Sequence, residues 1–464
     1  MNRNPYFVLI ALGIGLSSAH AQSTMSAVWM QRNQLFGTAR YNGSAGALAA
    51  LGGDGTSSLE NPALMNSSSF GGMELSGHFR SDRADLRSQG AGIGQAYIAG
   101  AWRIDSKTRF SLGLAHQQQG WFPNYWIQSE SNPEESAVSS WLNQSNGLSP
   151  DQLLSSGLYD AYVAYMGYLT NVGAGNQYSA DAEGLPSYRQ QRFVREYSSS
   201  SWSVPMAIKT SKFSVGMRIE RRNGRAQERF LMTESGFSPN GLTKAYEKTV
   251  VDSSLWRLWS LRLGVAFQAT ENLRISAALQ PATTAEVDWE YRNRVRPEAN
   301  DPSVDLTAFE LYDKQEFRYQ LPIQMQLGFA RTFGTQAALT GVWIYHGAVN
   351  ALISSPLSYY DIGRAMADEL MAHHQFRLGG EYRLSEAWTA RSGFQWSGSA
   401  TIFSDHSAQR MLGLGIGYQE LEYAVDLAYN LVQSSGSIKP PGGGGDWPLP
   451  TLHQRITGTY RLRF

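Results

Sequence analysis

The chain has 464 residues, and its 39 Lys and Arg balance 39 Asp and Glu, so the formal net charge is zero. This balance argues against a nucleic-acid binder, which needs basic excess, and the lack of Cys excludes disulfides, thiolate catalysis and Cys-ligated metals. Glycine (46 residues) and aromatics (12%) are abundant, whereas charged residues (17%) fall below the roughly 25% usual in soluble domains. Without a long apolar run, this composition favours a transmembrane β-barrel.

Residues 1–21 are predicted to be a cleavable signal peptide. Arg3 supplies the positive start, an apolar run follows from Tyr6 to Leu16, and Ala-His-Ala at 19–21 is a small-x-small cleavage site. The apolar run is too short for a membrane span of about 20 residues, which disfavours an uncleaved anchor. We therefore expect an exported protein.

Residues 22–69 are predicted to form a hatch that plugs the lumen of a barrel built from residues 70–464. The stretch from Ala39 to Asp54 consists mostly of Gly, Ala, Ser and Leu. Such small side chains make a poor lipid-facing strand but pack compactly inside a barrel.

Residues 120–200 are predicted to form a long extracellular loop, because barrels keep their periplasmic turns short and their outer loops long. Ser149 before Pro150 and Asp151 is a helix start, and this helix would carry Leu153, Leu154 and Leu158. Residues 350–374 are predicted to be a second such loop, with a short helix over 361–373.

Strand segments of ten residues or more show strict alternation of apolar and polar side chains. They exceed the usual soluble strand of about five or six residues and match a tilted crossing of the bilayer. A soluble β-sandwich also alternates, but the strand length and the aromatics at the ends of the apolar faces favour the barrel. No segment offers the 18 consecutive apolar residues of a membrane helix. The clearest segments are 212–221, 255–268, 318–330, 375–384 and 421–431.

The end of the chain carries a second localisation signal. Residues 435–450 are rich in Pro and Gly and are predicted to be a loop before the last strand, 455–464, which alternates up to a terminal Phe464. A closing strand of this kind resembles the signal read by the outer-membrane assembly machinery. We expect insertion into outer-membrane lipid in a diderm bacterium.

The segment from His374 to Trp396 (HQFRLGGEYRLSEAWTARSGFQW) resembles a signature hairpin of the FadL/TodX outer-membrane transporters for hydrophobic compounds. Glu60-Asn61-Pro62-Ala63-Leu64 is similar to that family's Asn-Pro-Ala element, and Leu321-Pro322 with Leu327-Gly328 resembles its Pro-bearing central strand. The resemblance implies an all-β, antiparallel barrel of about 14 strands, a monomer, with an N-terminal hatch. It also implies that a ligand lands on a groove between outer loops, enters the lumen and leaves sideways through a gap in the wall.

Two sets of site residues follow from these observations. An apolar cargo needs an apolar landing surface, and the alternative is that the same side chains pack the loop or lie at the membrane interface. By the resemblance, the Asn-Pro-Ala element would lie at the end of the hatch near the lateral gap, as a gate, and the alternative is a simple turn at Pro62. The landing residues are Trp121, Phe122, Tyr125, Trp126, Leu154 and Leu158, and the gating residues are Asn61, Pro62 and Ala63.

Charged lumen positions offer a choice between ligand binding and internal pairing. Arginines can hold a carboxylate through two hydrogen bonds, but pairing with neighbouring lumen acids is the favoured interpretation. The arginines are Arg218, Arg262, Arg377 and Arg383, and the acids are Glu220, Glu381, Glu422 and Asp426.

No cofactor, metal site or enzyme activity is expected. His373 and His374 are predicted to lie in a solvated loop, because neither Cys nor metal-ligand spacing accompanies them. Ser404, Asp405 and His406 are adjacent in the chain, which a working triad seldom is, and neither G-x-S-x-G nor H-E-x-x-H occurs.

The sequence therefore predicts an outer-membrane channel for passive uptake of hydrophobic small molecules, either long-chain fatty acids or aromatic hydrocarbons. The expected partners are this ligand, outer-membrane lipid and the assembly machinery, with no nucleic acid. The alternative is a structural or adaptor barrel that serves a secretion or surface-assembly complex.

Overall fold

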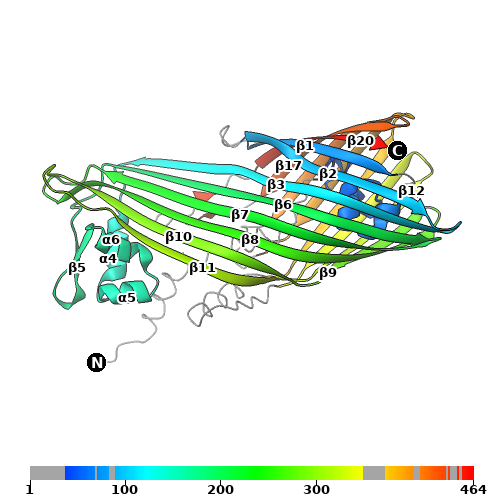
Figure 1. Cartoon of the computed structure of the whole chain (residues 1–464). Helices are drawn as coiled ribbons and strands as arrows, with labels where there is room; N and C mark the ends of the chain where they lie inside the picture. Colours follow the sequence, from blue (N-terminus) through cyan, green and yellow to red (C-terminus); the bar gives the residue numbers. More distant parts are fainter. Residues whose placement is uncertain are drawn as a thin grey trace, which may run out of the picture.

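The computed structural model of the protein describes residues 37–67, 71–82, 89–348, 371–400, 408–434, 437–438, 447–448 and 452–464. The predicted signal peptide, residues 22–36 of the predicted hatch and residues 350–370 of the second predicted loop lie outside these ranges. The described residues form a closed antiparallel barrel, with the blue hatch segments inside it (Figure 1).

The barrel closes through fourteen strands. The sheet contains 16 strand segments, and two of the wall strands are each divided into two segments. β9 and β10 both pair with β8, one after the other along its length, so together they form one wall strand. β11 pairs with β10 and β12 pairs with β9, so β11 and β12 together form the next wall strand. The ring closes where β1 (Gly72–Asp82) pairs with β20 (Leu452–Arg463). The segments of the two divided strands are β9 (Leu273–Gln280), β10 (Thr283–Ala299), β11 (Phe309–Leu321) and β12 (Gln324–Phe333).

The remaining wall strands follow one another as antiparallel neighbours in chain order. They are β2 (Gln89–Arg103), β3 (Thr108–Ser131), β6 (Tyr188–Thr210), β7 (Phe213–Ser235), β8 (Thr243–Thr270), β13 (Ala337–His346), β14 (His373–Arg383), β15 (Trp388–Ser397), β16 (Gln409–Gln419) and β17 (Tyr423–Ser434). Two short ladders lie outside the wall: β4 (Thr170–Val172) with β5 (Tyr178–Ala180), and β18 (Ser437–Ile438) with β19 (Trp447–Pro448).

The predicted alternation is confirmed in its orientation, except in 318–330, where Tyr319 and Leu321 are buried on the lumen side and the outward face begins only at Met325. In β7, Phe213, Val215 and Ile219 face outward and are exposed, whereas Arg218 and Glu220 face the lumen and are buried. The predicted continuous strand 318–330 is wrong at one point: it divides at Pro322-Ile323, because proline has no N–H for the ladder. Among the described residues, helices long and apolar enough to span a membrane are absent.

Aromatic rings gather at two levels of the outer surface. Near the short turns, Trp102 stacks on Phe110 and Trp388 packs against Tyr418. Six to eight residues further along the same strands, about 20–26 Å at 3.3 Å per residue, Phe376 stacks on Trp396 and His116 packs against Trp202. Such paired girdles mark the two interfaces of a membrane barrel. The short turns and the C-terminus then lie on the periplasmic side.

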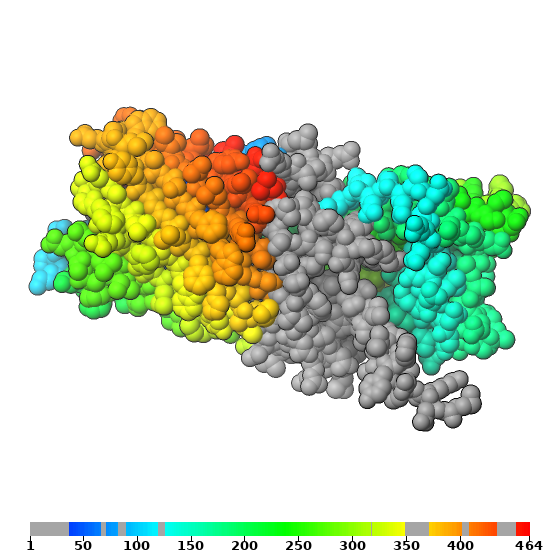
Figure 2. All heavy atoms as spheres, turned by 180° about the vertical axis from the view of Figure 1, so that it is seen from behind, coloured from blue at the N-terminus to red at the C-terminus, as the bar shows by residue number. Residues whose placement is uncertain are grey.

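Six strands, β3, β6, β7, β8, β10 and β11, continue beyond the outer girdle as a curved sheet, which we call the extension (Figures 1 and 2). β8 alone has 28 residues, about 90 Å at 3.3 Å per residue. The outer face of the extension carries charged pairs such as Arg257 with Glu286 and Lys244 with Glu298, so it lies outside the membrane. Residues 120–131 and 188–200 were predicted to be loop but are strands of the extension; without lipid on one side, their apolar alternation is weak.

Three helices, α4 (Ala137–Ser145), α5 (Pro150–Ser155) and α6 (Tyr159–Met166), cover the inner face of the extension and form a cap. Their apolar side chains share one core with the sheet, in which Trp141 packs against Tyr246. The predicted helix start is confirmed: Ser149 and Gln152 form a capping box. The helix ends at Ser155, because Gly157 takes a positive φ of 72° and turns the chain into α6.

Candidate functional site

The hatch consists of four short helical segments packed inside the barrel: α2 (Ala39–Gly43), η1 (Ala47–Ala50), α3 (Gly55–Glu60) and η2 (Pro62–Ser67). Thr38 and Asp54 cap α2 and α3 by accepting hydrogen bonds from backbone N–H groups. Nearly every residue from 37 to 65 is buried. Small side chains allow this density, as the composition of the segment indicated.

Glycines in the wall form two seats for the hatch. Gly379, Gly393 and Gly413 lie side by side across β14, β15 and β16 and face the lumen; we call them the glycine stripe. A Cβ on Gly393 would lie 2.0 Å from the carbonyl oxygen of Ser44, and one on Gly413 would lie 2.5 Å from that of Asn42. No larger residue fits there, because the obstacle is hatch backbone.

The second seat holds the Asn-Pro-Ala element. Gly216 and Gly264 pair across β7 and β8, and Cβ atoms there would lie 2.5 Å from Pro62 and 2.1 Å from Asn61. The Asn61 amide donates to the carbonyl oxygen of Ala277 in β9 at 3.1 Å. Asn61 therefore fixes the end of the hatch to a specific place on the wall, so the element does more than form a turn at Pro62.

Polar side chains of the wall satisfy hatch backbone and side-chain groups elsewhere. Thr459 accepts from the Ala39 N–H at 2.7 Å, Glu74 accepts from the Gly55 N–H at 2.7 Å, and Asn430 donates to the Asn42 carbonyl at 2.7 Å. Each bond is buried, so opening it without a replacement leaves an unsatisfied group. The hatch is held by many separate polar contacts and a close steric fit.

Three arginines hold the end of α3. Arg218 donates to the Leu59 carbonyl at 2.6 Å and Arg262 donates to the Glu60 carbonyl at 3.0 Å. Arg377 binds both carboxylate oxygens of Glu60, at 2.9 and 2.8 Å, and Tyr41 donates to the same carboxylate at 2.7 Å. Carbonyls at the end of a helix lack intrahelical donors, and cations are favourable there.

The predicted internal pairing of the lumen arginines holds in part. Arg218 pairs with Glu220 at 2.9 Å, but Arg377 pairs with Glu60 of the hatch instead of a wall acid. Glu381 and Asp426 pair with Arg40 and Arg391. Arg383 and Glu422 are exposed near the periplasmic turns. Sequence reasoning missed Glu60 as a partner, although it adjoins the Asn-Pro-Ala element.

A polar cavity of about 80 Å³ lies in the lumen over the face of the hatch that carries Glu60; we call it the upper cavity. Arg262, Arg377 and Arg455 line it together with His346 and His373. The two imidazoles stack with ring centroids 4.4 Å apart. The prediction of a solvated loop at His373 and His374 is therefore wrong, since both belong to β14. Among the described residues, groups of three or more candidate metal ligands are absent.

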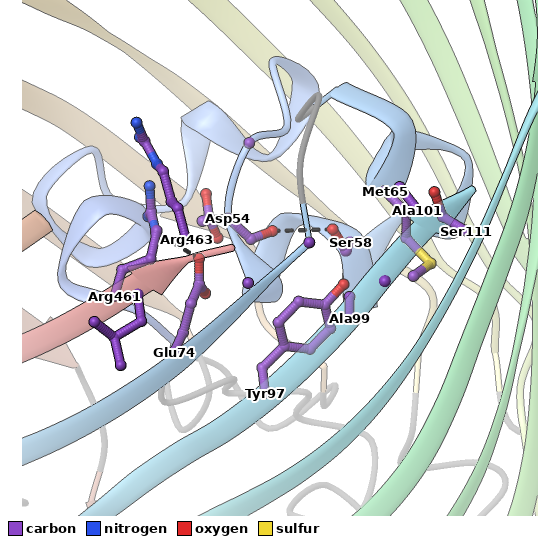
Figure 3. A pocket seen from close by; sticks show the side chains of 15 residues that line it. Asp54, Ser58, Met65, Glu74, Tyr97, Ala99, Ala101, Ser111, Arg461 and Arg463 are labelled. Atoms are coloured by element: carbon purple, nitrogen blue, oxygen red, sulfur yellow. Dashed lines mark hydrogen bonds and ion pairs between the residues drawn. The ribbon is translucent and has the colours of Figure 1, made fainter. Parts of the chain in front are cut away.

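A second cavity of about 290 Å³ lies on the periplasmic side of the hatch, next to β1, β2 and β20 (Figure 3). Charged side chains lie at one end, where Arg461 pairs with Glu74 at 2.7 Å. Tyr97, Met65 and Ser111 lie at the other end. The cavity has room for a small organic molecule.

The ladder between β3 and β6 is interrupted at mid-membrane height. Pairing runs up to Leu112 with Met206 and resumes at Ala115 with Ser203. The gap lies at Gly113 and Leu114, opposite Val204 and Pro205, where proline supplies no N–H. Behind the gap lies Met65 of the hatch, whose methyl group would be 3.3 Å from a Cβ on Gly113.

The predicted landing residues lie in and beside the cap. Trp126 packs on Phe193 at 5.4 Å between ring centroids, and Leu158 packs against the cap core, while Leu154 is exposed. The backbones of Trp121, Phe122 and Tyr125 belong to β3, and their side chains lie outside the described part of the structure. Trp126 and Leu158 therefore pack the extracellular cap at least in part, which was the alternative to a landing surface.

No family model and no curated protein matches the sequence. Solved structures do match over almost the whole chain. The CymD monoaromatic hydrocarbon channel has a TM-score of 0.52 at 13% identity, covering 93% of this chain and 98% of its own. The P. putida toluene transporter TodX has 0.51 at 14%, covering 93% and 99%, and a Pseudomonas aeruginosa FadL homologue has 0.50 at 12%, covering 92% and 98%. The chain therefore has the FadL/TodX-type fold, as the hairpin resemblance implied.

Proposed function

We propose that the protein is an outer-membrane channel for passive uptake of hydrophobic small molecules, such as aromatic hydrocarbons or long-chain fatty acids. The observation that carries the proposal is a closed membrane barrel whose lumen is blocked by a seated, polar-anchored hatch. Solved structures with this fold include a monoaromatic hydrocarbon channel and a toluene transporter. A plug that is held by separable contacts suits gated passage better than a purely structural wall.

Cargo enters at the extension in this proposal. Leu154 is exposed on the cap, and the half-buried Trp126 and Leu158 leave part of their surface open while they pack on the cap core, so an apolar molecule meets a small apolar surface outside the membrane. The Asn61-Pro62-Ala63 element then acts as the gate, because it is the hatch end fixed against β7, β8 and β9.

The lateral exit lies at the interrupted β3–β6 ladder. Lost ladder bonds at Pro205 weaken the wall where the hatch lies directly behind it, and apolar cargo passes from there into lipid. This location is within reach of the Asn-Pro-Ala element, as η2 contacts β6, β7 and β8.

An engineered disulfide tests the exit cleanly, because the chain has no Cys. Leu114→Cys with Val204→Cys places two outward-facing residues across the interruption, at the separation of opposite strand residues. The matched control is Val215→Cys with Val265→Cys, an outward-facing pair in an uninterrupted ladder. We expect oxidation of the first pair alone to abolish uptake of labelled toluene and dodecanoate, and reduction to restore it.

Equal uptake by both oxidised variants would place the exit elsewhere. Equal uptake by cells with and without the protein, for every apolar compound, would refute the channel itself. The extension favours the second candidate, an adaptor for a surface complex, because it presents charged sheet surface far outside the membrane. That role predicts co-purification of a stable partner, lost when the cap is deleted.

A further inference from the structure

The upper cavity is chemically unlike the apolar path that a hydrocarbon requires. Three arginines and two histidines line it, against a single carboxylate, that of Glu60. The Nε atoms of Arg262 and Arg377 are buried without a hydrogen-bond partner in the described structure. The cavity therefore presents more donors than its own residues use.

One carboxylate already occupies this site, and it comes from the hatch. Glu60 accepts both bonds from Arg377 and one from Tyr41, while the Arg377 guanidinium lies 5.6 Å above the Tyr41 ring. Glu60 directly precedes Asn61, so its carboxylate and the gate belong to one rigid piece of chain. Release of the Glu60 carboxylate removes the ion pair at this end of the hatch and leaves it held by the weaker contacts of Arg218, Arg262 and Asn61.

We propose that Glu60 and Arg377 form a latch, and that a carboxylate head group of amphiphilic cargo opens it by replacing Glu60 on Arg377. This inference rests on the proposed function, and it adds the chemistry of the cargo and the event that releases the hatch.

The exchange is favourable for an anion and unfavourable for a neutral molecule. A cargo carboxylate keeps Arg377 paired while the Glu60 carboxylate moves out into water with the displaced hatch end, so the number of buried ion pairs is unchanged and no charge is left buried and unpaired. A neutral molecule that displaced Glu60 would leave the guanidinium buried and unpaired, which is strongly destabilising. The cavity of about 80 Å³ holds several waters, each of which needs about 10–15 Å³ of such space, and this is room for a carboxylate and the first carbons behind it. The rest of an alkyl chain remains in the lumen above.

Thiol labelling of the hatch measures the latch directly. Ala49→Cys puts the chain's single thiol at a fully buried hatch position, where Cys is close to Ala in size. The full-length protein in micelles is treated with a thiol reagent alone, or with sodium dodecanoate, 1-dodecanol or sodium acetate. We expect dodecanoate to accelerate labelling at least tenfold, and dodecanol and acetate to leave it unchanged.

Variants of the pair complete the test. Glu60→Gln and Arg377→Gln each break the ion pair with little change of shape, so both should label at least tenfold faster without ligand. Dodecanoate should then add nothing to Arg377→Gln. The matched control is Arg383→Gln, an exposed arginine on the same strand, which should behave like the parent protein.

Acceleration by dodecanol equal to that by dodecanoate would overturn the head-group assignment, and so would acceleration by acetate alone. Slow labelling of Glu60→Gln in a folded, heat-modifiable barrel would show that the pair is no latch. The comparison of dodecanoate with dodecanol needs no latch variant, so it decides the matter even if a variant fails to fold. The labelling assay does not depend on transport. If cells take up no toluene through the protein but dodecanoate still accelerates labelling, the channel is refuted and the latch stands.

Discussion

Adding a single Cβ atom to a residue of the glycine stripe tests how the hatch is held in the barrel. In Gly393→Ala, the added Cβ would lie 2.0 Å from the carbonyl oxygen and 2.4 Å from the carbonyl carbon of Ser44. Ordinary contacts between such atoms are about 3.5 Å, so the overlap exceeds 1 Å. Both atoms are hatch backbone, and the strand is fixed by ladders to β14 and β16. The hatch must therefore move, since no side chain can rotate aside.

The cost follows from the contacts that this movement breaks. Overpacking of a dense interior costs about 1–3 kcal/mol. The bonds from Asn430 to the Asn42 carbonyl and from the Ala39 N–H to Thr459 lie on the same helix, and a lost net hydrogen bond costs about 1 kcal/mol. A total of about 3–5 kcal/mol shifts the balance between seated and unseated hatch by about 100- to 4,000-fold.

The assay is ion conductance of the purified protein in planar bilayers, with folding checked by heat-modifiable mobility. We expect frequent openings for Gly393→Ala. The matched control is Gly458→Ala, a strand glycine whose added Cβ meets nothing within 4 Å. Indistinguishable conductance of the two variants would refute the claim that backbone contact at the stripe holds the hatch.

Two further predictions concern the extension. Lys248→Ala removes the cation that binds Asp160 at 2.7 Å and leaves this carboxylate with its hydrogen bond from Asn293. It should destabilise the cap by about 3 kcal/mol, seen as faster proteolysis within residues 132–187; unchanged proteolysis would contradict it. Burial raises the pKa of Asp252, in the extension outside the membrane, to about 7, so protonation favours the folded extension and stability is lost as pH rises from about 4 to 7. Asp252→Asn should abolish that pH dependence of proteolysis, and an unchanged slope would refute the assignment.

The sequence predicted the membrane-facing part of the fold because lipid imposes a simple rule. Each wall strand must present an apolar face, and this appears as a period of two in segments such as 212–221 and 421–431. The same rule fails in the extension, where water meets the sheet: residues 188–200 lack an apolar face, and they were predicted to be loop. Pro322 is evident in the sequence, but only the hydrogen-bonded pairing of β11 and β12 with their neighbours showed that it divides the strand.

The site was less accessible to sequence reasoning. The Asn-Pro-Ala element was found through a family resemblance, yet its neighbour Glu60 was not assigned a partner. Arg377 lies 317 residues away, and no local pattern couples positions that far apart. The inward glycines of β14, β15 and β16 were the available signal: in a strand, a glycine weakens the wall unless something packs closely against it.

The sequence by itself determined that this protein is a Cys-free membrane barrel with a small-residue plug, because composition and alternation report directly on contact with lipid. Only the tertiary structure decided where the plug is seated, which arginine holds it and how far the strands continue outside the membrane. Those features depend on the register of strands distant in the chain, which brings Gly393 under Ser44 and Arg377 against Glu60.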